Sequence, residues 1–173
     1  MNPRHIAWAV GLAALVALPF VYREPYHLHI LVLILIWSFA YTSWSIMGRF
    51  GLVSLGHGGF MGVGAYVTAL LWNHLGLSSW VCIPIALVWA GALVRICMTA
   101  HAPLVTLALS GIVLQVTTAT RDYTGGSLGY TPNRTKGSQL LALQFDDKIT
   151  WYLIALFVWV LGLLVWRWVD RSM

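Results

Sequence analysis

The residues of this sequence that could bind a small molecule lie in two segments far apart along the chain. They are Ser54, Gly56, His57, Gly58, Thr106 and Ser110. A polar side chain at membrane depth is costly, so it usually has a partner or a function. We therefore take these six residues as a candidate substrate path. The alternative is that the histidine and the hydroxyls only bond to neighbouring backbone carbonyls, and the sequence leaves both interpretations open.

Catalysis and metal binding are not expected. The five acidic residues all lie outside the apolar runs, so no carboxylate stands beside His57 in the sequence. Cys82 and Cys97 fall on one apolar segment and would be about 22 Å apart on a continuous helix, which excludes a disulfide between them. No spacing of histidines and cysteines is typical of a zinc site. We expect no enzyme activity, no metal and no cofactor.

The composition indicates a membrane protein. Of the 173 residues, 60% are hydrophobic and 9% are charged, with a mean hydropathy of +0.80, and these values exclude an ordinary water-soluble domain. The formal net charge of +5 comes from scattered Arg and Lys residues beside apolar segments, without a basic run. Such charges mark the flanks of membrane helices. We therefore expect the lipid bilayer, and no nucleic acid, as a partner.

Apolar runs separated by polar turns predict an all-α polytopic membrane helix bundle of about six transmembrane segments. The predicted spans are residues 6–21, 28–47, 51–72, 81–99, 104–120 and 151–168. Each is close to the length that crosses a hydrocarbon core of about 30 Å. No cleavage site of small residues follows the first run, so we interpret it as an uncleaved span. Residues 1–173 are predicted to form a single membrane domain, with an extramembrane loop at about 121–150.

The third predicted span consists mostly of small residues. Six of them would share a sector of roughly 80° on a continuous helix: Gly51, Ser54, Gly58, Gly62, Ala65 and Ala69. Helices in lipid associate by close packing, and Gly58-x-x-x-Gly62 has the spacing that allows it. The same glycines weaken a helix by about 1 kcal/mol each relative to alanine. The segment is therefore predicted to be either a tightly packed helix or a broken, re-entrant one.

Three motifs, taken in order, resemble the permeases of branched-chain amino-acid ABC importers. They are the glycine-rich residues 51–66, Thr106-Leu-Ala-Leu109 and Thr124-Gly-Gly-Ser-Leu-Gly129. The similarity covers roughly residues 48–172 and is weakest over 93–103. It implies an amino-acid translocation subunit of the bacterial inner (cytoplasmic) membrane. The implied partners are a second permease, two cytoplasmic ABC ATPases and a periplasmic binding protein.

The resemblance is to the N-terminal half of such a permease. In the family, a stretch like Arg167-Trp-Val-Asp-Arg-Ser172 leads into the cytoplasmic coupling loop that contacts the ATPase, whereas this sequence ends at Met173. We therefore expect a truncated or split permease that is not transport-competent alone and needs its missing half from another polypeptide. The alternative is a permease-derived accessory or structural subunit of a larger membrane protein complex, without transport activity.

The basic residues predict that both termini are cytoplasmic and that residues 73–79 and 121–150 are periplasmic. Outside the long loop, arginines are concentrated on the predicted cytoplasmic side, as the positive-inside rule requires. The basic residues of the loop make the totals on the two sides equal. The charge rule therefore supports this topology only in combination with the number of spans.

Single cysteines at Ser138 and Ser172, in a chain that lacks Cys82 and Cys97, test this orientation. Ser138→Cys should react with an impermeant thiol reagent added to intact cells, because the long loop is predicted to be periplasmic. Ser172→Cys should be protected until the cells are permeabilised. Labelling of Ser172→Cys in intact cells contradicts the predicted topology.

Overall fold

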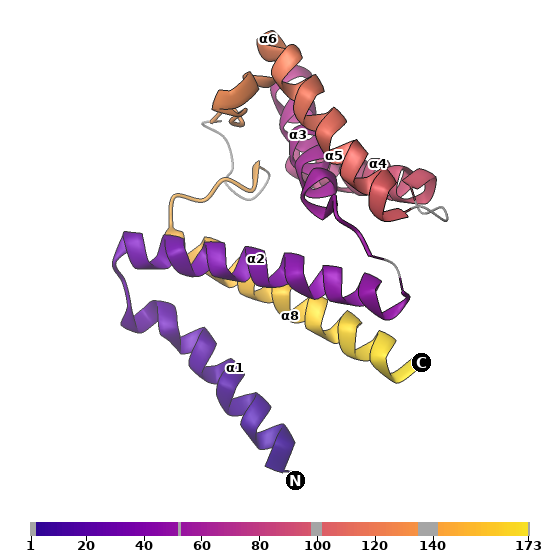
Figure 1. Cartoon of the computed structure of the whole chain (residues 1–173). Helices are drawn as coiled ribbons and strands as arrows, with labels where there is room; N and C mark the ends of the chain where they lie inside the picture. The colour runs from indigo at the N-terminus through magenta and orange to yellow at the C-terminus, as the bar shows by residue number, and fades with distance from the viewer. Residues whose placement is uncertain (1–2, 52, 98–101, 135–141, 173) are drawn as a thin grey trace. The chain divides into compact units, whose positions relative to one another are not determined.

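The computed structural model describes residues 3–51, 53–97, 102–134 and 142–172, and the regular elements in them are all helical (Figure 1). The elements are α1 (Pro3–Val21), α2 (Pro25–Arg49), α3 (His57–Leu75), α4 (Ser79–Cys97), α5 (Ala102–Ala119), α6 (Arg121–Thr124), the 3-10 turn η1 (Gly126–Leu128) and α8 (Lys148–Ser172). The all-α prediction is confirmed for these residues. The long loop predicted at 121–150 contains α6 and η1, and α8 begins within its last residues.

Three of the described helices are long and apolar enough to cross a membrane by length and composition: α2, α4 and α8. Two shorter apolar helices cover Val10–Val21 and Pro103–Ala119. The chain is thus a multi-pass membrane protein. Six spans remain a prediction, since α3 meets neither of these two descriptions.

The contacts divide the chain into two compact units, and each is described by itself. The first unit is Met1–Ile46 with Phe145–Met173, and the second is Met47–Gln144. The single membrane domain predicted for residues 1–173 stays a prediction.

The first unit is centred on a cluster of buried residues from α2 and α8. Leu35, Tyr152 and Leu156 form the cluster, and Leu15 of α1 packs against it. The Tyr152 hydroxyl donates a hydrogen bond of 2.9 Å to the Leu15 carbonyl. Tyrosine suits this position because its ring is apolar while its hydroxyl needs a partner when buried.

Helices α2 and α8 run in the same direction, side by side (Figure 1). Leu35 packs near Leu156, Phe39 lies against Gly162, and Trp166 donates its indole N–H to the Ser45 hydroxyl at 3.3 Å. Residues in contact have increasing numbers along both helices, and this defines parallel packing. Two parallel spans require the chain between them to cross the membrane an odd number of times. This agrees with the prediction that α3, α4 and α5 each cross once.

The second unit begins with a helical hairpin. Gly76 ends α3 in the left-handed conformation (φ 61°), and its N–H bonds to the Trp72 carbonyl. Glycine is favoured at this position because it adopts positive φ without strain. Helix α4 returns antiparallel to α3, with Pro84 inside the helix. Helix α5 packs along α3 on another side, which makes α3 the helix that joins the unit together.

The prediction of a helix from residue 51 is wrong in its first part, because α3 begins only at His57. Gly51 has a positive φ of 70° and lies in a turn after α2, and residues 53–56 are not helical. Gly51 and Ser54 therefore do not belong to a helical stripe with Gly58 and Gly62. The broken alternative describes this segment better than the continuous helix.

Several sequence predictions concern residues outside the described ranges. Among them are Thr99 at the end of the predicted fourth span, and Lys136 and Ser138 in the long loop.

Candidate functional site

The candidate site lies where the chain enters α3. Residues 53–56, the entry segment, are not helical, and Gly56 precedes α3 without a side-chain cap. The Gly59 N–H bonds to the Gly56 carbonyl at 2.9 Å, which closes the first turn. The many glycines disfavour helix here, so a non-helical entry at this point has a local cause in the sequence.

Two glycines, one in the entry segment and one in the first turn of α3, allow the chain to lie directly on α5 here. A Cβ at Gly56 would overlap the carbonyl oxygen of Thr106, and a Cβ at Gly59 would lie 3.0 Å from the Cα of Ser110. Backbone can approach backbone this closely only where a side chain is absent. The two segments that carry the candidate residues therefore meet, although they are far apart in the sequence.

Thr106 fixes the contact with its hydroxyl group. The side chain is fully buried, at 0% exposure. Its Oγ1 accepts a hydrogen bond from the Leu55 N–H at 3.2 Å and donates one to the Pro103 carbonyl at 3.1 Å. A backbone N–H outside a helix has no intrahelical partner, so this part-buried one needs such an acceptor. Thr106, in the first turns of α5, thus supplies a hydrogen-bond acceptor to a backbone N–H of the non-helical segment before α3.

The structure brings together four of the six residues predicted for a substrate path. Ser54 and Gly56 are buried in the entry segment, and Thr106 and Ser110 lie opposite on α5. The Ser110 hydroxyl donates to the Leu107 carbonyl at 2.7 Å, which is the intrahelical bond that the alternative interpretation foresaw.

The other two predicted residues lie at the start of α3. His57 is its first residue and is half-buried, and Gly58 is exposed within the unit. All six residues are thus at or beside the junction of the entry segment with α5. Their role in a substrate path remains a prediction.

The small residues predicted for helix packing differ in whether another element lies against them. Within the described residues nothing lies within 4 Å of a Cβ built at Gly58 or Gly62, whereas Ala69 is buried. Ala65 is exposed. The packing role of Gly58, Gly62 and Ala65 stays a prediction for a contact beyond this unit.

Gly59 was missed because the predicted helix began six residues too early. With the helix start placed at His57, the short spacing between Gly56 and Gly59 would have indicated the face that contacts α5.

The motif Thr124-Gly-Gly-Ser-Leu-Gly129 forms a compact turn after α5. The Thr124 hydroxyl donates to the carbonyls of Thr117 and Thr120 and accepts the Gly126 N–H at 3.2 Å. Gly125 has a positive φ of 72°, and a Cβ there would overlap the Gly129 carbonyl oxygen. The motif therefore shapes the end of α5 and the start of the following loop.

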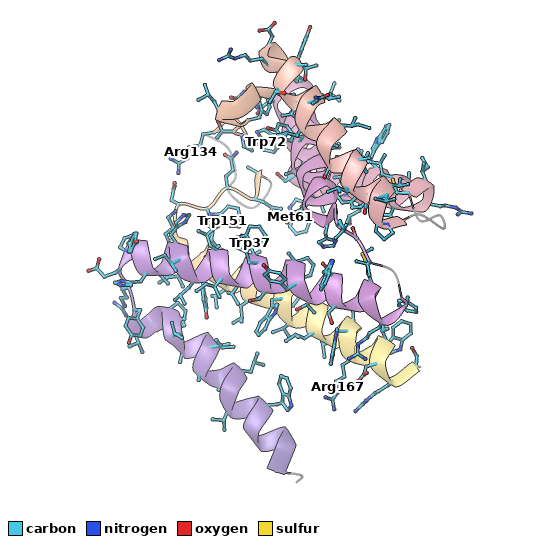
Figure 2. All side chains as sticks on the ribbon, viewed as in Figure 1. Trp37, Met61, Trp72, Arg134, Trp151 and Arg167 are labelled. Atoms are coloured by element: carbon cyan, nitrogen blue, oxygen red, sulfur yellow. The ribbon has the colours of Figure 1, made fainter. Side chains whose placement is uncertain are left out.

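The loop after this turn is hydrogen-bonded to the last residues of α3. Asn73 donates to the Thr131 carbonyl at 3.1 Å and accepts the Asn133 N–H at 2.7 Å. Trp72 donates to the Asn133 carbonyl at 2.9 Å. Figure 2 shows Trp72 near the segment that carries Arg134. Helix α3 thus contacts α5 at its first residues and the loop at its last.

The site can offer hydroxyl groups, one imidazole and backbone groups, and its six residues include no carboxylate, lysine or arginine. Among the described residues there is no group of three or more His, Cys, Asp and Glu that could hold a metal ion.

Comparison with known proteins now identifies the class. Residues 26–172 match the family model of the branched-chain amino acid transport system permease component. The chain belongs to this family of membrane transport components.

Two curated relatives are similar over a shorter stretch. The high-affinity branched-chain amino acid transport system permease protein LivM of Escherichia coli (strain K12) is 49% identical over 47 residues, which are 27% of this chain and 11% of that protein. LivM of Salmonella typhimurium is 49% identical over 41 residues, 24% of this chain and 10% of that protein. The aligned part thus spans about a tenth of these relatives. No solved structure matches the chain.

The contact between Gly56 and Thr106 predicts a large difference between neighbouring glycines. Gly56→Ala should lower the free energy of unfolding by about 1–3 kcal/mol or more, because the new methyl group overlaps backbone that cannot move easily. Gly58→Ala and Gly62→Ala are matched controls, since both have open space. Thermal melting of the purified chain in detergent measures the effect. Equal melting temperatures for Gly56→Ala and Gly58→Ala contradict the packing described.

Proposed function

We propose that this chain is a membrane-spanning permease subunit of a branched-chain amino-acid ABC importer in a bacterial inner membrane. Family membership and the resemblance of its motifs support the transport class. The observation that carries the proposal is the junction of the entry segment with α5, which gathers the candidate residues. We propose that Ser54, Gly56, His57, Gly58, Thr106 and Ser110 border the substrate path.

The chemistry of a branched-chain amino acid fits this junction. Such a substrate has an apolar side chain and a zwitterionic head. Broken helices line substrate sites in transporters, where the N-terminal end of a helix attracts a carboxylate through its free N–H groups and dipole. The start of α3 is such an end, and Gly58, its second residue, has open space beside its backbone. The Ser110 hydroxyl and the His57 imidazole, both half-buried, add polar groups without a fixed charge, and Thr106 holds the entry segment beside them.

Transport requires other subunits under this proposal. The matched family is one component of a transport system, and no nucleotide-binding motif was found in the sequence. We infer a second membrane subunit, ABC ATPases that supply energy and a periplasmic binding protein that delivers the amino acid. The chain alone is expected not to perform ATP-driven uptake.

Uptake of labelled leucine into proteoliposomes tests the proposal. Vesicles that contain the chain, the polypeptide that supplies the missing half of the permease, a second permease subunit, the ATPases and the binding protein should take up leucine when ATP is supplied, and excess isoleucine or valine should compete. Vesicles that lack the second membrane subunit should take up none. Absence of uptake by the fully assembled complex contradicts the proposed function.

His57→Ala and Ser110→Ala should each lower leucine uptake by about tenfold, the effect of one lost hydrogen bond to a substrate. The matched control is Thr118→Ala, because Thr118 also bonds to carbonyls within α5 but lies two turns beyond Ser110. Assembly of the complex should be unchanged in all three variants. Equal uptake by the site variants and the control removes these residues from the substrate path.

A further inference from the structure

The C-terminal end of α8 carries two arginines one helical turn apart. Arg167 and Arg171 are both exposed, and Trp168 between them is 72% exposed. Figure 2 shows Arg167 close to the C-terminal end of α8. Within the described part of the chain, no hydrogen bond or ion pair holds either guanidinium group. The two cations therefore stand open on the outside of the first unit.

These residues continue an exposed apolar face of the same helix. At about 100° per residue, Leu161 and Leu164 share a sector of roughly 120° with Arg167, Trp168 and Arg171. Leu161 and Leu164 are 45% and 57% exposed. An apolar face that ends in an exposed tryptophan and then in arginines matches the profile of a bilayer, from hydrocarbon through the interface to the headgroups.

The charge at this membrane end is positive. Asp170 is the acidic residue of the last turn of α8. Two arginines against one aspartate at the end of α8 favour an anionic ligand. Arginine binds phosphate oxygens with two parallel N–H groups, which makes it better suited than lysine to a phosphodiester.

We propose that this face of α8 is a binding site for an anionic phospholipid, with the headgroup phosphate between Arg167 and Arg171 and an acyl chain along Leu164 and Leu161. The combined surface distinguishes this ligand from free phosphate, because the apolar part has no use for a soluble ion. A general flanking role, in which the arginines only orient the helix in the membrane, requires neither their common face nor the adjoining leucines. The site is independent of the proposed substrate path.

The test measures lipid retention by the full chain in nanodiscs, in which phosphatidylglycerol is titrated against phosphatidylcholine. Native mass spectrometry counts the anionic lipids that remain bound. The double variant R167Q/R171Q should bind phosphatidylglycerol about thirtyfold more weakly than the wild type, because it loses the charge-assisted hydrogen bonds of two guanidinium groups to one phosphate. It should melt like the wild type in pure phosphatidylcholine, which shows that the fold is intact.

The matched control is R23Q/R95Q, which removes the same charge from two exposed arginines elsewhere. This control should bind phosphatidylglycerol within about twofold of the wild type, since Arg23 precedes α2 and Arg95 lies on α4, so the two are not one helical turn apart on one helix and do not form a paired phosphate site. Equal weakening by both double variants means that net charge alone attracts the lipid, and it overturns the proposal. Displacement of the lipid by millimolar inorganic phosphate, or unchanged binding by R167Q/R171Q, overturns it as well.

Discussion

The approach of the Gly56 backbone to the Thr106 carbonyl is the constraint on which the second unit depends. A side chain at Gly56 would overlap that carbonyl, so the entry segment can lie against α5 only if residue 56 is glycine. The same contact leaves the part-buried Leu55 N–H outside a helix, and Thr106 supplies the acceptor. This one close approach thus explains the glycine at position 56, the threonine at position 106 and the late start of α3.

This constraint has particular weight in a bilayer. Lipid tails are as apolar as leucine, so helices in a membrane gain little from hydrophobic burial against each other and depend on close contact and interhelical hydrogen bonds. Both units follow this rule. The first is joined by Tyr152 to α1 and by Trp166 to α2 through polar groups on aromatic rings, and the second by backbone contact at Gly56 and Gly59.

The helical segments were predictable because long apolar runs with polar ends have few alternatives in lipid. The sequence also indicated which two segments carry the candidate residues. It could not indicate that they meet, since contact between segments so far apart depends on packing that no local pattern specifies. The start of α3 was misplaced because the glycine-rich residues fit both a packed helix and a broken one. The choice depends on the Leu55–Thr106 hydrogen bond, a tertiary interaction.

Substrate protection of a single cysteine tests most directly whether the junction at Gly56 and Thr106 borders a substrate path. Ser110→Cys, in the assembled importer and without Cys82 and Cys97, is labelled with a small thiol reagent in the presence and absence of leucine. The account predicts that leucine slows labelling at this position and leaves labelling of Leu128→Cys unchanged, because Leu128 is 87% exposed on the turn beyond α5. Labelling of Ser110→Cys at the same rate with and without leucine, in a complex that still transports, would contradict the account.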